Sequence, residues 1–272
     1  MASNPRQIHP VAFFGLTFAL SWAIWVPLAL AHFGIGPLAI PDAVSQMARL
    51  LGVLMPAAAA LLLTTRAGGR AGVGRLLGGL VFWRVNWRWW AAAGLVQPAL
   101  LGLTGLVYNA VGGQPPVAAA PPVSATAFAV HAFFLLLATL GEEIGWRGVA
   151  LPSLQHRHSP FVASLILGLL WAVWHAPFWL LMDTFDQFGP GYLVLNVLFV
   201  LAGNFYMTWF FNHGRSSLLL AVVFHLTFNL VNVAWLPVTT AVGAYGWFIA
   251  MQGVIAALVL PRLAPRPRPT GL

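Results

Sequence analysis

Cysteine and lysine are absent from this chain, and acidic residues are scarce. Charged residues make up only 7% of its 272 residues, whereas hydrophobic residues make up 60%. The absence of cysteine excludes disulfide bonds and thiolate chemistry. Because a soluble domain carries about 25% charged residues, so few charges exclude a surface that faces only water. The composition therefore indicates a protein that lies in a lipid bilayer.

The basic residues are all arginines, and they give the chain a net charge of +8 at pH 7. Such a charge can indicate a nucleic-acid partner. Here, however, the arginines are scattered between apolar runs, which a membrane explains better than a phosphate-binding groove does. We expect membrane lipid, and no nucleic acid, among the partners.

The apolar runs predict an all-α fold, because a transmembrane helix needs about 20 mostly apolar residues. We predict a polytopic membrane protein with about eight transmembrane helices, of which the second is short. Residues 1–260 would form a single integral-membrane helical domain with a motif-bearing core at about 126–236, and 261–272 a disordered Pro/Arg-rich cytoplasmic tail. The predicted spans are about 11–32, 50–65, 89–111, 126–149, 160–182, 190–211, 217–236 and 240–260.

Arginine positions predict the orientation of these spans. With eight spans, twelve of the 13 arginines fall on one side of the membrane, five of them between the second and third spans, and Arg49 is the exception. Short cytoplasmic loops carry the excess of positive charge, so both termini are predicted to be cytoplasmic. The first run is longer than the roughly 7–15 residues of a signal-peptide core, and we expect it to be retained as a span.

Ionisable residues inside a span are costly and indicate function by default. Glu142, Glu143 and Arg147 lie at the end of the fourth span. Glu143 and Arg147 are four residues apart on one helix face, in the favourable acid-first order. Glu142 points about 100° away, so an ion pair of Glu143 with Arg147 would leave Glu142 to act as a general base. A buried ion pair that only fixes helix packing is the alternative.

Two further spans contribute His175, and His225 with Asn229 four residues later. A carboxylate, two imidazoles and an amide supply a base, a group that orients water and donors for a tetrahedral intermediate. They can converge only if the fourth, fifth and seventh spans are neighbours. The same cluster could hold Zn²⁺ or another divalent metal, with Glu143, His175 and His225 as candidate ligands.

These three segments resemble the intramembrane proteases of the CAAX-processing and bacteriocin-processing (CPBP, or Abi) family, which includes the type II CAAX prenyl endopeptidases. The family motifs are Glu-Glu-x-x-x-Arg, Phe-x-x-x-His and His-x-x-x-Asn, and they occur here in the same order. Trp171 stands where the family has Phe, which keeps an aromatic ring. The matching residues are Glu142, Glu143 and Arg147, then Trp171 and His175, then His225 and Asn229.

The resemblance implies an intramembrane endopeptidase with an eight-helix core. Glu142 and His175 would activate a water molecule, and His225 and Asn229 would stabilise the oxyanion. Glu143 and Arg147 would support the site. A metalloprotease and a metal-free glutamate mechanism both stay open. We expect a multi-pass protein of a prokaryotic plasma membrane that acts on a membrane-associated protein or peptide, and whether that substrate is prenylated stays open.

Two other functions use the same residues. A transporter could pass protons or cations along the buried Glu and His side chains, although such proteins often show inverted repeats and none is evident here. A non-catalytic bacteriocin-immunity protein could retain the fold without the reaction.

Overall fold

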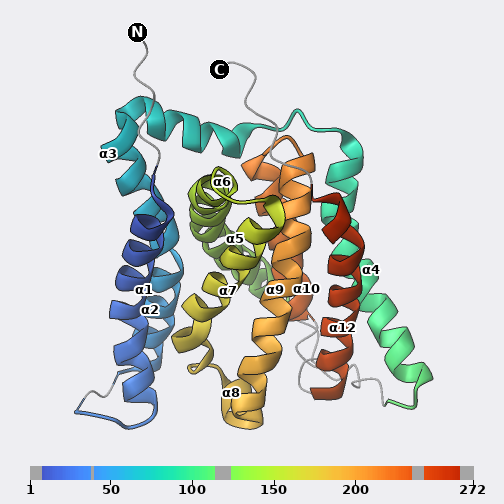
Figure 1. The fold of residues 1–272 in the computed structure, drawn as a ribbon. Coiled ribbons are helices and arrows are strands. Elements are labelled where there is room, and N and C mark those ends of the chain that lie inside the picture. Colours follow the sequence, from blue (N-terminus) through green and yellow to red (C-terminus); the bar gives the residue numbers. More distant parts are fainter. Residues whose placement is uncertain (1–7, 38–39, 114–123, 235–241, 264–272) are drawn as a thin grey trace.

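The computed structural model describes residues 8–37, 40–113, 124–234 and 242–263, and Figure 1 shows their arrangement. Within these ranges the chain forms helices and connections without any strand, which confirms the predicted all-α fold. The Pro/Arg-rich tail predicted for 261–272 lies outside the described residues from 264 onwards. The elements are α1 (Pro10–His32), α2 (Asp42–Val53), α3 (Met55–Gly78), η1 (Gly79–Val81), α4 (Trp87–Ala110), α5 (Ala125–Gly145), η2 (Trp146–Ala150), α6 (Leu151–Gln155), α7 (Pro160–Trp179), α8 (Asp183–Phe188), α9 (Pro190–His213), α10 (Leu218–Ala234), α12 (Val242–Val259) and η3 (Leu260–Arg262).

Each of the eight predicted spans coincides with a helical segment. Seven segments of the described chain are long and apolar enough to cross a membrane, and α10 is a shorter apolar helix. The protein is thus a multi-pass integral membrane protein. The first described turn of α1 and the last turn of α12 lie at the same end of the bundle (Figure 1). That this end is cytoplasmic stays a prediction.

The second span and the connection after it differ from the sequence prediction. The span begins at Asp42, because α2 and α3 follow one another with only Leu54 between them. The arginine-rich stretch that follows is not a loop but the second half of α3, which lies across one end of the bundle (Figure 1). Gly69 makes this bend possible, because its φ of +57° is a conformation that side chains with a Cβ rarely adopt.

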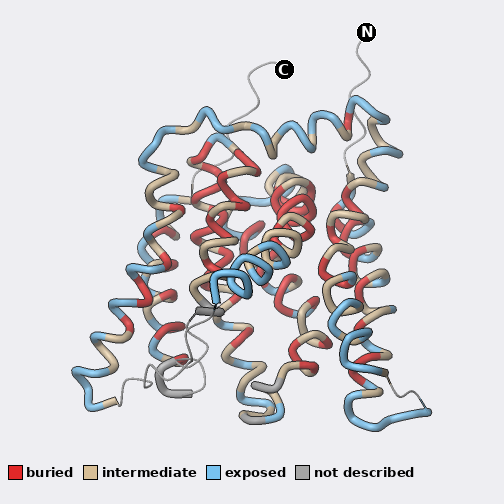
Figure 2. Tube along the Cα trace, turned by 180° about the vertical axis from the view of Figure 1, so that it is seen from behind, coloured by how far each residue is buried: buried red, intermediate tan, exposed pale blue. Residues whose placement is uncertain are grey.

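The most buried part of the chain lies in the middle of the bundle, and the outer helices expose one side (Figure 2). α9 packs between α7 and α12, and α10 packs against α4 and α5. Indole N–H groups tie α1 to its neighbours: Trp174 Nε1 donates to Ser21 Oγ (2.8 Å) and Trp25 Nε1 donates to the Arg49 carbonyl (3.1 Å). Arg49, the exception to the arginine pattern, donates to the Leu181 carbonyl beyond the end of α7 (3.0 Å).

The end of α5 lies very close to the start of α3, and Gly145 permits this contact. A Cβ at Gly145 would lie 2.6 Å from Pro56 Cβ and 2.9 Å from the Pro56 carbonyl carbon and oxygen. Because backbone atoms cannot yield as a flexible side chain can, the two helices would have to separate. This contact therefore fixes where the end of α5, which carries Glu142 and Glu143, lies relative to α3.

Gly145→Ala is expected to lower the free energy of unfolding by about 1–3 kcal/mol, the usual cost of overpacking. Gly102→Ala in α4 is the matched control, since a Cβ there meets nothing within 4 Å and alanine favours a helix by about 0.5–1 kcal/mol over glycine. Thermal unfolding of both variants in detergent provides the comparison. Equal stability of the two variants would contradict the close contact.

Candidate active site

The two glutamates of the first motif lie in the last turn of α5, inside the bundle. Glu142 is 5% exposed and Glu143 is fully buried. The helix then widens into the π-helical turn η2, which carries Arg147. Single π-turns interrupt α-helices rarely and often at functional sites. Here the π-turn begins three residues after Glu143.

Glu143 forms the ion pair that the four-residue spacing predicts. Arg147 Nη1 donates to Glu143 Oε1 (3.0 Å), and His225 Nδ1 donates to the same oxygen (2.8 Å). Both side chains of the ion pair are fully buried. Because its Nδ1–H is bound to a carboxylate, the His225 ring is fixed with Nε2 directed away from Glu143.

A second set of contacts holds Arg147 in place. Arg147 Nη2 donates to Asn204 Oδ1 (2.9 Å) in α9, and the guanidinium carbon lies 4.6 Å from the centre of the Trp171 ring. Asn204 in turn donates to the Ser164 carbonyl (2.6 Å) in α7. The charge of Arg147 is thus met by a carboxylate, an amide oxygen and an aromatic face, which is what a buried guanidinium requires.

Glu142 lies in a different environment from Glu143. Its Oε2 accepts hydrogen bonds from the indole nitrogens of Trp171 (2.7 Å) and Trp146 (3.3 Å). The same oxygen lies 3.9 Å from His175 Nε2. The structure therefore places one carboxylate with a cation and the other with neutral donors and an imidazole, the separation that the helix geometry predicts.

The orientation of His175 is fixed by the backbone of its own helix. Its Nδ1 lies 2.9 Å from the Trp171 carbonyl, which can only accept, so Nδ1 carries the hydrogen and Nε2 faces Glu142 as an acceptor in the neutral ring. The ring also stacks on Trp179, with centroids 5.2 Å apart and planes 4° apart. A gap of 3.9 Å between Nε2 and Glu142 Oε2 is too long for a direct hydrogen bond and suits one bridging water.

Asn229 lies one turn beyond His225 in α10 and is partly buried. Its Nδ2 donates to Thr139 Oγ1 (3.3 Å) in α5. The structure thus brings Glu142 to His175 and Glu143 to His225. Trp171 links the two pairs, since its ring centre lies 5.9 Å from that of His175 and 5.5 Å from that of His225. α5, α7 and α10 meet at this site as expected, and α9 joins them through Asn204.

The proposed metal ligands do not form a ligand set. In the described part of the chain, no group of three His, Asp or Glu side chains is arranged to hold a metal ion. Glu143 Oε1 is bound by Arg147 and His225 Nδ1, whereas Glu143 Oε2 is buried without a hydrogen-bond partner among the described residues. His175 faces the other glutamate, so the three side chains do not converge on one metal position.

Sequence reasoning missed two contributors to this site. Trp171 was predicted to act only as an aromatic replacement for Phe, but its indole N–H binds Glu142, which phenylalanine cannot do. A tryptophan buried in an apolar span needs an acceptor for its N–H, and this signal could have revealed the contact. Asn204 is an intramembrane amide, which is expected to hydrogen-bond between helices, but its sequence position in α9 gives no sign that its partner is Arg147.

A bundle of apolar helices around a buried cluster of glutamate, histidine and asparagine defines an integral membrane protein with a reactive polar centre. Comparison with known proteins narrows this class. Residues 122–231 match the family model described as "Type II CAAX prenyl endopeptidase Rce1-like". CAAX prenyl protease 2 of Methanococcus maripaludis is 36% identical over 114 residues, which cover 39% of this chain and 40% of that relative.

The match confirms the resemblance predicted from the three motifs, and all of the motif residues lie within 122–231. The alignment spans less than half the length of the relative. The activity and the substrate of the whole protein are therefore matters for proposal.

Proposed function

We propose that this protein is an intramembrane endopeptidase, which hydrolyses a peptide bond of a membrane-associated protein or peptide with a water molecule activated by Glu142. One observation carries the proposal: Glu142 Oε2 lies 3.9 Å from His175 Nε2 and is bound by two indole N–H groups within the bundle. Activation of water requires a carboxylate that is free to take a proton. Glu142 fits this role because it is paired with no arginine and lies beside an imidazole.

The reaction would begin with a water molecule bound between Glu142 Oε2 and His175 Nε2. As the water oxygen attacks the substrate carbonyl carbon, Glu142 takes one of its protons. A tetrahedral intermediate forms with its negative charge on the former carbonyl oxygen. Glu142 then returns the proton to the leaving nitrogen, the C–N bond breaks, and the products are a new carboxyl terminus and a free amine.

The oxyanion would be stabilised by two groups on α10, the side-chain amide of Asn229 and the Nε2–H that His225 carries as an imidazolium, since its Nδ1–H is already bound to Glu143. Glu143 supports this role because its carboxylate binds Nδ1 of His225 (2.8 Å) and orients the ring. Arg147 balances the charge of Glu143. Removal of one such oxyanion donor commonly slows acyl transfer by about 10²–10³-fold.

We propose the glutamate mechanism rather than the metal mechanism, since Glu143 is paired with Arg147 and His225, whereas His175 faces Glu142. The substrate class follows from the relative, which is named as a prenyl protease. We therefore propose a peptide whose lipid group holds it in the membrane. The family match favours this function over the transporter and the non-catalytic immunity protein.

The test is cleavage of a synthetic farnesylated peptide ending in Cys-Val-Ile-Met by the purified protein in lipid nanodiscs, followed by mass spectrometry. The expected result is release of the three-residue peptide, at the same rate before and after treatment with 1,10-phenanthroline. Absence of cleavage of any farnesylated or geranylgeranylated peptide would contradict the proposed substrate. Activity that the chelator abolishes and Zn²⁺ restores would contradict the glutamate mechanism.

Trp171→Phe is expected to lower kcat about tenfold and leave KM nearly unchanged, because a hydrogen bond to a charged group contributes about 1.5–3 kcal/mol and this one orients the base rather than the substrate. Trp90→Phe is the matched control, since its indole N–H also binds an oxygen, the Trp83 carbonyl (3.3 Å), and α4 carries none of the candidate site residues. Steady-state kinetics of both variants distinguishes the roles. A loss of activity of equal size in the two variants would assign Trp171 a merely structural role.

A further inference from the structure

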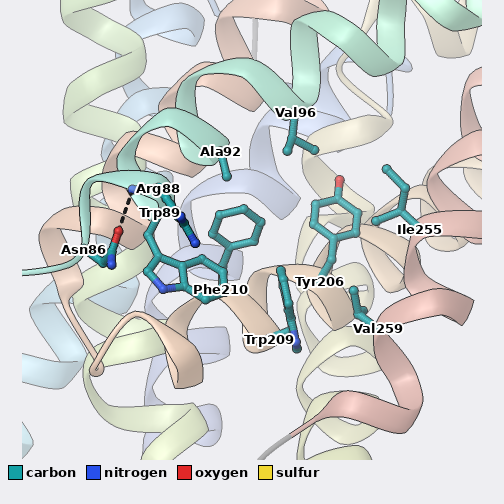
Figure 3. Close-up of a pocket in the computed structure, with 10 residues that line it drawn as sticks. All are labelled: Asn86, Arg88, Trp89, Ala92, Val96, Tyr206, Trp209, Phe210, Ile255 and Val259. Atoms are coloured by element: carbon teal, nitrogen blue, oxygen red, sulfur yellow. Dashed lines mark hydrogen bonds between the residues drawn. The ribbon is translucent and has the colours of Figure 1, made fainter.

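A cavity of about 510 Å³ lies between α4, α9 and α12 (Figure 3). None of the residues of the candidate active site lines it. Its walls come from distant parts of the sequence: four residues of α4 with the preceding N-cap residue, three residues of α9 and two of α12. The lining residues are Asn86, Arg88, Trp89, Ala92, Val96, Tyr206, Trp209, Phe210, Ile255 and Val259.

The cavity is apolar along its length and positive at one end. Arg88 and the N-terminus of α4 lie at that end, and Ala92 and Val96 continue the wall along the helix (Figure 3). From Arg88 to Val96 an α-helix rises roughly 12 Å, enough to shelter much of one hydrocarbon chain. The helix dipole of α4 adds positive charge at its N-terminus, where Asn86 Oδ1 accepts the Arg88 N–H (3.0 Å; Figure 3).

The walls of the cavity are tied together by a ring of polar side chains behind it. Gln97 Nε2 in α4 donates to the Tyr206 hydroxyl in α9 (2.9 Å), this hydroxyl donates to Gln252 Oε1 in α12, and Gln252 Nε2 donates to Gln97 Oε1 (3.3 Å). Hydrogen bonds between apolar helices hold them at a fixed spacing. The cavity is therefore a built feature of the three helices.

The positive end has no carboxylate to balance it. Arg88 lines this end of the cavity, Arg84 precedes it by four residues, and Arg215 Nη1 donates to the Arg84 carbonyl (3.0 Å). Within the described ranges, the ion pairs involve only Asp186, Glu142 and Glu143, so these three arginines have no acidic partner. Trp209 Nε1 is buried at the cavity wall without a hydrogen-bond partner among the described residues.

We propose that this cavity binds one anionic phospholipid of the bilayer. Its phosphate would lie against Arg88 and the N-terminus of α4, and one acyl chain would fill the slot past Ala92 and Val96. Charge complementarity favours an anionic headgroup over a zwitterionic one, because the phosphate meets the unbalanced guanidinium of Arg88 and no carboxylate.

The test is native mass spectrometry of the full-length protein released from nanodiscs that contain equal amounts of phosphatidylglycerol and phosphatidylcholine. The expected result is one retained phosphatidylglycerol per protein. Arg88→Ala should weaken its retention about tenfold, as expected for the loss of a charged hydrogen bond. Ala92→Trp, which fills the slot, should also release the lipid. Arg70→Ala removes an exposed arginine of α3 that does not line the cavity and should leave retention unchanged.

Equal retention of the two lipids, or equal loss in Arg88→Ala and Arg70→Ala, would overturn the proposal. Thermal unfolding of each variant shows whether the fold is intact, and Arg88→Ala keeps the test valid if Ala92→Trp does not fold. Displacement of the bound phospholipid by the farnesylated peptide alone would assign the cavity to a substrate chain and would also overturn it. This proposal does not depend on the peptidase activity.

Discussion

Glu142→Gln is expected to lower the rate of peptide hydrolysis by about 10²–10⁴-fold, the usual contribution of a general base. Glutamine has nearly the same shape, and its amide oxygen can still accept the indole N–H groups of Trp171 and Trp146, which now bind Oε2. It cannot take a proton from water. The loss should therefore appear in kcat, as measured by product formation in nanodiscs.

Two measurements make this result specific. The unfolding temperature of Glu142→Gln should stay within a few degrees of wild type, since no ion pair with an arginine is removed. Phosphatidylglycerol retention at the separate cavity should be unchanged as well. A variant that retains wild-type kcat would show that Glu142 is not the base, whatever its stability.

Arg147→Met is expected to lower the free energy of unfolding by about 3–5 kcal/mol, because it leaves a buried carboxylate without its cation. Arg147 is fully buried and lies 3.0 Å from Glu143. Arg157→Met, at an exposed position between α6 and α7, is the matched control and should change stability by less than about 0.5 kcal/mol. Chemical unfolding in detergent provides the values.

A double variant tests the cause of this loss. Adding Glu143→Gln to Arg147→Met removes the uncompensated charge, so the double variant should be more stable than Arg147→Met alone. If the two substitutions instead add their costs, the ion pair is not what holds the end of α5 and the turn η2 together.

Contacts within one helix could be predicted from the sequence, because helix geometry fixes them. The four-residue spacing of Glu143 and Arg147 predicted an ion pair that the structure contains at 3.0 Å. The same geometry separated Glu142 from this pair. The apolar runs predicted a helical segment at each of the eight positions, because a bilayer requires long apolar helices, although the second segment begins earlier than predicted, at Asp42.

Contacts between helices could not be predicted in the same way. Asn204 reaches Arg147 across 57 positions of the chain, and nothing near Asn204 in the sequence identifies its partner. Trp171 was recognised by its place in a motif, but its bond to Glu142 depends on how α5 and α7 pack. The bend of α3 at Gly69 was missed because the glycines and arginines of that stretch are as typical of a loop as of a bent helix.

Hydrolysis by a water molecule that Glu142 activates is tested most directly by following the oxygen of that water in a single turnover. Wild-type protein would cleave the farnesylated peptide in H₂¹⁸O, and mass spectrometry would read the new carboxyl terminus. After the first turnover, one ¹⁸O atom is expected in the carboxylate formed by wild-type protein. Glu142→Gln is expected to form no labelled product in the same time. An unlabelled first-turnover product, or no cleavage by wild type, would contradict hydrolysis by a water molecule that Glu142 activates.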